Sequence, residues 1–163
     1  MSEAMTQLDP ILEIATFTRM TGSFFAKDLN ALSDEAYLEK KAETCRTMQD
    51  IVAECVTINQ YMVAELNGET FPEWSEATAA NMELVATRSA GIALIASSAN
   101  DLADASVANR DKLGNMTMAP WKEEVTMFMM LTITAAHMMY HDGQVTYLQQ
   151  LCGDEKMHWF DEA

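Results

Sequence analysis

The sequence has 163 residues, 49% of them hydrophobic, and a formal net charge of −15. The length is typical of a single domain over residues 1–163, and the hydrophobic content excludes a disordered chain. The acidic charge argues against nucleic acid or an anionic membrane surface as a partner, because both are bound through basic patches. With 6 glycines and 3 prolines, long segments run without a break, which favours helices.

The targeting and cysteine patterns predict a cytoplasmic protein. The first residues are polar and acidic, so we expect no signal peptide, and no apolar run approaches the ~20 residues of a membrane span. The three cysteines, Cys45, Cys55 and Cys152, form no C-x-x-C pair. Their spacing excludes a zinc ribbon and a thioredoxin-like motif.

The first half of the chain predicts two long helices. Apolar residues at steps of three and four indicate a helix at residues 9–29, followed by a short helical turn at Ser33 and a polar loop at residues 40–46. A second helix is predicted at residues 47–66. Thr47 and Asp50 form a pair like a capping box at its start, and Asn67-Gly68 ends it.

The second half predicts two more long helices. The third is expected at residues 76–108, with an inner face of unusually small side chains, and a loop follows at residues 109–119. The fourth is expected to begin at Pro120 and to end at Gly153, since proline favours the first turn of a helix and glycine its end. No strand-like alternation persists, so the pattern predicts an all-α four-helix bundle.

Two histidines on the fourth helix indicate a metal site. His137 and His141 are four residues apart, so they share one helix face and lie about 6 Å apart at the backbone. Both fall on the apolar face of that helix, where a divalent cation would satisfy both imidazoles at once. Met138 stands where an H-E-x-x-H protease has its general base, so that chemistry is not indicated. The alternative is a pair of core histidines bonded to the backbone or to polar neighbours.

A catalytic metal site uses three protein ligands and an open position, so a third ligand is needed. Glu54 is the strongest candidate, because it lies near the apolar stripe of the second helix and a buried carboxylate needs a cation or several donors. Asp50 is a weaker candidate. Cys55 could supply a thiolate, although a lone cysteine on a helix is more often inert core. His158 lies beyond the helix end and would have to fold back. If Glu54 instead lies at the edge of the stripe, it reaches solvent.

Neighbouring residues have supporting roles in this hypothesis. Gln144 lies one turn after His141 and could bond a metal-bound water or a ligand histidine. Tyr140 and Tyr147 are expected to pack, and Asp142 is expected to face solvent. Trp74 and Trp121 are expected to plug the ends of the bundle.

The last helix resembles a known family. The stretch HMMYHDGQVTYLQQLCG is similar to the H-x3-H-x-GQ-x2-Y-L-x2-LG ending of DinB-like (DinB/YfiT) proteins. The stretch from Leu29 to Gly68 resembles the family's link between its first two helices and the helix that carries its first ligand.

This resemblance implies a four-helix bundle that holds a divalent metal, most often nickel or zinc, and that forms a homodimer. It implies metal ligation by His137 and His141, and it places Glu54 at the ligand position of the second helix, where the family has histidine. Characterised relatives act on small substrates with low-molecular-weight thiols, and many members have no assigned reaction.

Three functions remain open on this basis. The leading one is a divalent-metal-dependent enzyme, a thiol-dependent transferase or a hydrolase acting on a small molecule. The second is a non-catalytic small-molecule-binding or stress-response dimer whose metal site is degraded. The third is a structural bundle that oligomerises through its methionine-rich seam.

Overall fold

The computed structural model describes residues 8–119 and 121–162 of the chain. This part is mostly helical, as the sequence predicts. The helices are α1 (Pro10–Ala31), α2 (Asp34–Leu38), α3 (Met48–Asn67), α4 (Trp74–Leu84), α5 (Arg88–Ala108) and α6 (Met127–Leu151). A 3-10 turn (Arg110–Lys112) precedes two short antiparallel strands, β1 (Met116–Met118) and β2 (Glu124–Thr126).

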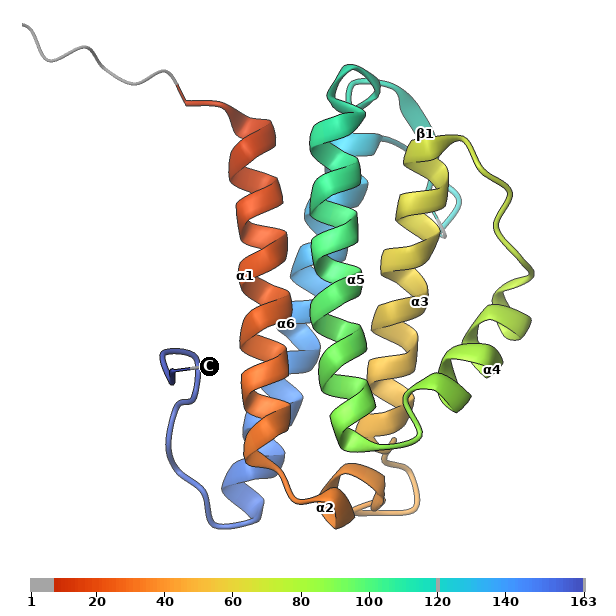
Figure 1. Cartoon of the computed structure of the whole chain (residues 1–163). Coiled ribbons are helices and arrows are strands. Elements are labelled where there is room, and N and C mark those ends of the chain that lie inside the picture. Colours follow the sequence, from red (N-terminus) through yellow and green to blue (C-terminus); the bar gives the residue numbers. More distant parts are fainter. Residues whose placement is uncertain (1–7, 120, 163) are drawn as a thin grey trace, which may run out of the picture.

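The four long helices α1, α3, α5 and α6 run side by side (Figure 1). Helix α5 packs against both α1 and α3, and α6 packs against the same two helices. The short helix α4 lies along the outside of α3, and α2 lies at one end of the long helices with the β1–β2 hairpin at the other. None of the helices in the described residues combines the length and the apolar character that a membrane crossing needs.

Side-chain caps explain where the long helices begin. The Asp9 carboxylate accepts a hydrogen bond from the Ile11 backbone N–H (3.0 Å) at the start of α1. Thr47 and Asp50 form a reciprocal capping box at the start of α3, and Gly68, with φ 73°, ends that helix in the left-handed conformation. These caps satisfy backbone groups that a helix end leaves without partners. The predicted bounds of the first two long helices agree with the structure to within two residues.

The predicted third helix at residues 76–108 is wrong in one respect, because the structure divides it into α4 and α5. Val85 leaves the helical conformation, and the Thr87 hydroxyl accepts from the Ala90 N–H (3.2 Å) to begin α5. The Tyr37 hydroxyl donates to the Val85 carbonyl (3.0 Å), which therefore keeps a partner at the break. The apolar pattern continues through these residues, so periodicity alone does not reveal the break.

The predicted start of the last helix is also wrong. Pro120 lies outside the described residues, but residues 121–126 are not helical and α6 begins at Met127. Residues 116–118 and 124–126 pair as strands, although no strand was expected. Three-residue strands are too short to show alternation in a sequence, and Thr126 caps α6 directly after the hairpin.

The contact between α1 and α5 depends on a glycine. A Cβ atom added at Gly22 would overlap the Ala99 Cβ of α5. Neither atom belongs to a flexible side chain, so the two helix backbones would have to separate. Gly143, by contrast, is a mid-helix glycine of α6 with open space around it.

We expect Gly22→Ala to destabilise the protein by about 1–3 kcal/mol, the usual cost of overpacking. The matched control Gly143→Ala should stabilise it by up to about 1 kcal/mol, because alanine is the better helix former. Urea unfolding of both variants measures the difference. Equal stability of the two variants would contradict the close approach of α1 and α5.

The C-terminal tail packs back onto α1. The Trp159 ring stacks on Phe24 with a centroid distance of 4.5 Å, and its indole N–H donates to the Asp28 carboxylate (2.9 Å). The Lys27 ammonium donates to the Trp159 carbonyl (3.0 Å) and to the Asp161 carbonyl (2.7 Å). Residues after α6 are therefore held against the side of α1.

Two carboxyl groups are buried beneath this tail. Asp142 is 0% exposed and Asp28 is 1% exposed, so the expectation that Asp142 faces solvent is wrong. Burial, and then the negative charge of Asp28, raise the pKa of Asp142 to about 8. A protonated Asp142 can donate a hydrogen bond to Asp28, which satisfies a buried pair that could not ionise together without a large cost.

The raised pKa of Asp142 makes stability depend on pH. A carboxyl group whose folded pKa exceeds its unfolded value of about 3.9 loses its stabilising contribution as pH rises from about 4 towards 8. We expect Asp142→Asn, which stays neutral, to be more stable than the wild type at pH 8 by at least about 1 kcal/mol and nearly equal at pH 4. The measurement is urea unfolding of both metal-free proteins across this pH range. If their free energies of unfolding changed with pH in the same way, the raised pKa of Asp142 would be contradicted.

Candidate metal centre

The structure brings together three of the predicted site residues from two helices. His137 and His141 lie on consecutive turns of α6, and Glu54 lies on the facing side of α3. His141 is buried, with 4% of its surface exposed, whereas His137 and Glu54 are half-buried. The group therefore lies in the seam between α3 and α6, open to solvent on one side.

The three side chains form a compact triangle of donor atoms. The Nε2 atoms of His137 and His141 are 3.1 Å apart, and the Glu54 Oε1 atom lies 3.1 Å from the first and 3.8 Å from the second. Ligand atoms about 2.0–2.1 Å from a tetrahedral ion are about 3.3 Å apart. The edges of this triangle are close to that spacing.

The contact with Gln144 selects one tautomer of His141. Its Oε1 atom lies 2.7 Å from His141 Nδ1, so this ring nitrogen carries a proton and donates it to the amide. In this tautomer the lone pair is on Nε2, towards His137 and Glu54. His137 Nε2 can carry only one proton, but it faces two acceptors, Glu54 Oε1 and His141 Nε2. A cation would satisfy His137, His141 and Glu54 together.

Charges around Glu54 keep it ionised. Burial raises its pKa, but the positive charge and hydrogen bond of Arg46 and the nearby histidines outweigh burial and leave the pKa below its usual value. The Arg46 guanidinium lies 2.5 Å from Glu54 Oε2. Burial, together with the charge of His141, lowers the pKa of His137 and favours its neutral, ligating form. The sequence predicts a polar loop that ends at Arg46, and its local pattern does not indicate the contact with Glu54.

Cys55 offers an alternative third ligand. Its Sγ atom lies 3.8 Å from His137 Nδ1, and one ligand atom from each of Cys55, His137 and His141 lies within 4.8 Å of the others. These three residues could hold a metal ion. Burial, and then the charge of Glu54, raise the pKa of the Cys55 thiol, so it is protonated at neutral pH. Cys55 is buried, as inert core would be, and its contact with His137 also fits the thiolate ligand that the sequence allows.

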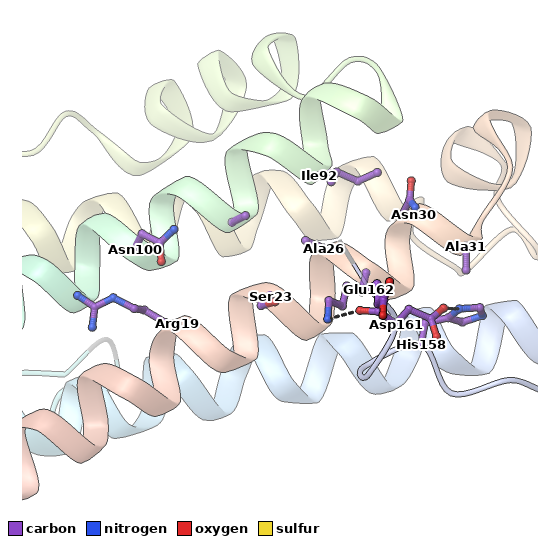
Figure 2. Close-up of a pocket in the computed structure, with 12 residues that line it drawn as sticks. Arg19, Ser23, Ala26, Asn30, Ala31, Ile92, Asn100, His158, Asp161 and Glu162 are labelled. Atoms are coloured by element: carbon purple, nitrogen blue, oxygen red, sulfur yellow. Dashed lines mark hydrogen bonds and ion pairs between the residues drawn. The ribbon is translucent and has the colours of Figure 1, made fainter.

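The other candidate ligands lie apart from this group. The Asp50 carboxylate accepts hydrogen bonds from Thr47 in the capping box of α3 (2.8 and 2.7 Å). His158 lies in the C-terminal tail, where Nε2 contacts Asp154 (2.9 Å) and Nδ1 contacts Asp161 (2.7 Å). It lines a separate cavity of about 730 Å³ between α1, α5 and the tail (Figure 2).

Two cavities meet at His137. The first, called the polar cavity for its charged side chains, has a volume of about 610 Å³ and a wall that also contains apolar residues. Its lining includes Glu54, both histidines, Gln144 and Arg46. Tyr140 and Tyr147 also line it, and they are exposed there instead of packing into the core. An apolar cavity of about 480 Å³ lies along the same seam. Trp74 and Trp121, expected as end-plugs, line this second cavity.

The family comparison covers nearly the whole chain. Residues 1–162 match the model of the DinB family. The comparison with curated proteins gives no match.

The contact between Gln144 and His141 can be tested in metal-free protein. We expect histidine ¹⁵N NMR to show His141 protonated on Nδ1, because Gln144 accepts that proton. Gln144→Leu should remove this preference and shift the population towards the Nε2-protonated tautomer. A wild-type His141 protonated on Nε2 would contradict the proposed direction of its lone pair.

Proposed function

The chain belongs to the DinB family, and we propose that it is a divalent-metal-dependent enzyme of that family's four-helix type, acting on a small molecule. The observation that carries the proposal is the triangle of His137, His141 and Glu54 donor atoms, with edges of 3.1–3.8 Å between two helices. The polar cavity beside it gives a small molecule access to that triangle. A single domain over residues 1–163 would carry the whole site.

Glu54 is favoured over Cys55 as the third ligand for electrostatic reasons. A metal ligand must be deprotonated, and the lowered pKa of Glu54 means that this carboxylate is already ionised. Binding through Cys55 would require loss of a proton from a buried thiol whose pKa is raised. His137 would then use Nε2 for the ion and keep Nδ1 towards Cys55. Two imidazoles and one carboxylate form a ligand set that catalytic zinc uses, and imidazole also suits nickel.

When bound, the ion would lower the pKa of water or a thiol at the open position and so supply a nucleophile. The chain's own residues perform the other tasks. Gln144 orients His141, and Arg46 keeps Glu54 ionised. Arg46 and Lys41 line the polar cavity, each paired with a carboxylate that also lines it, Glu54 and Glu39. The cavity therefore offers both charges to the polar groups of a ligand such as a low-molecular-weight thiol. The function is a thiol-dependent transfer or a hydrolysis in the cytoplasm, carried out by a homodimer.

A second function is supported by Arg46 itself. The Arg46–Glu54 ion pair already neutralises the carboxylate and competes with a cation for it. If this pair prevails, the protein is a non-catalytic small-molecule-binding dimer that keeps the cavity and not the metal.

Metal titration of tag-free, chelator-treated protein separates these functions. We expect one Zn²⁺ or Ni²⁺ per chain, with affinity reduced at least about tenfold in Glu54→Ala and His141→Ala, since even indirect partners of metal ligands have effects of that size. Glu65→Ala is the matched control, because it removes another half-buried glutamate about three turns further along α3.

Two outcomes would contradict the proposal. The absence of stoichiometric metal binding would favour the non-catalytic function. An unchanged affinity in Glu54→Ala, together with a loss in Cys55→Ala, would replace the proposed ligand set with Cys55, His137 and His141.

A further inference from the structure

The wall of the apolar cavity beside the candidate metal centre is formed almost entirely by the apolar parts of aliphatic, aromatic and methionine side chains. It lies between α3 and α6, has a volume of about 480 Å³, and has no charged side chain in its lining. Thr134 is one of its few polar residues, and the Thr134 hydroxyl already donates to the Met130 carbonyl (2.9 Å). The cavity therefore offers shape and apolar contact to a ligand and little hydrogen bonding apart from His137 at one end.

The aromatic part of the wall is held in place by neighbouring rings. Tyr61 makes edge-to-face contacts with Phe71 (5.4 Å between centroids) and with Trp74 (6.2 Å). On the hairpin side, the indole N–H of Trp121 donates to Glu123 Oε2 (3.1 Å), so its polar group has a partner. Rings fixed in this way can receive a ligand with little loss of side-chain freedom.

His137 connects this cavity with the proposed metal site. Its side chain lines both the apolar cavity and the polar cavity that contains Glu54 and Arg46. A molecule whose reactive atom lies at the triangle of His137, His141 and Glu54 can therefore extend an apolar part to one side and a charged part to the other. Charged side chains line the polar cavity and are absent from the lining of the apolar cavity, so the two cavities suit different ends of a ligand.

We propose that the apolar cavity is the binding site for an uncharged aromatic or branched alkyl group of the substrate. This inference rests on the proposed function for its connection to the metal, but the binding itself does not require the ion. The volume falls in the range of small-molecule pockets, and an uncharged group avoids the cost of desolvating a charge in a hydrocarbon wall. Trp74 and Trp121, 46% and 47% exposed, stand at the solvent side of this wall and would be covered by the ligand.

The test uses prodan, an uncharged naphthalene dye, with the full-length chain. Ile133→Trp places a larger side chain in the cavity at a half-buried position of α6. Ile92→Trp is the matched control, since Ile92 is also half-buried but lines the separate cavity between α1 and α5. Ile58→Trp fills the cavity from α3 and replaces Ile133→Trp if that variant does not fold.

We expect saturable binding of prodan by the wild type, an affinity at least about tenfold weaker in Ile133→Trp, and a change of less than about twofold in Ile92→Trp. The absence of saturable binding, or equal affinities in the two variants, would overturn the proposal. A shift from dimer to monomer in Ile133→Trp, measured by sedimentation, would also overturn it, because a second copy would then cover the cavity.

Zn²⁺ titration of the same proteins keeps the two proposals apart. Ile133 is not a proposed ligand, so Zn²⁺ affinity should be equal in the wild type and both variants. Prodan binding that is lost in Ile133→Trp supports the apolar site whether or not Zn²⁺ binds. A failure to bind Zn²⁺ refutes only the metal proposal.

Discussion

The site depends on the way α3 and α6 face each other across a seam that is only partly filled. His137 and His141 come from one helix and Glu54 and Cys55 from the other, so the donor atoms meet only because these helices pack at this separation. Cavities of about 610 and 480 Å³ lie on the two sides of His137. Such space costs dispersion contacts that a fully packed core would make. The opposite side of the molecule is packed more closely, since α1 and α5 approach at Gly22 with only the Ala99 methyl group between them.

Charge and burial determine which of the potential ligands in this seam is deprotonated. Arg46 and the histidines hold Glu54 in its ionised form, while burial and the charge of Glu54 keep the adjacent Cys55 thiol protonated. One residue therefore suppresses the ligating form of its neighbour. Arg46 has two opposed effects, because it ionises the carboxylate that a cation needs and also competes with the cation for it. This balance decides between a metalloenzyme and a protein that keeps only the cavity.

The face of α6 next to the histidines has a different role. Asp142 follows His141 directly but turns towards α1, where it meets Asp28 under the Trp159 ring. Consecutive residues of a helix point about 100° apart, so α6 contributes to two polar clusters at the same level. The C-terminal tail covers the cluster of Asp28 and Asp142. Its contacts with Lys27 and Phe24 hold the C-terminal half of α1 against α6.

The sequence by itself determined the helical class and the position of the paired histidines, because both follow from spacing along one helix. It also named Glu54 as a candidate ligand, from the apolar stripe of the second helix and the family's ligand position there. Only the tertiary structure decided which groups surround them. The Arg46–Glu54 pair, the contact of Cys55 with His137 and the burial of Asp142 against Asp28 join residues distant in sequence, and periodicity carries no information about them. The break at Val85 and the β1–β2 hairpin also depended on local capping and short-range pairing that an apolar pattern does not record. Helical spacing fixes which face a residue occupies, whereas the neighbours of that face follow from how the helices pack.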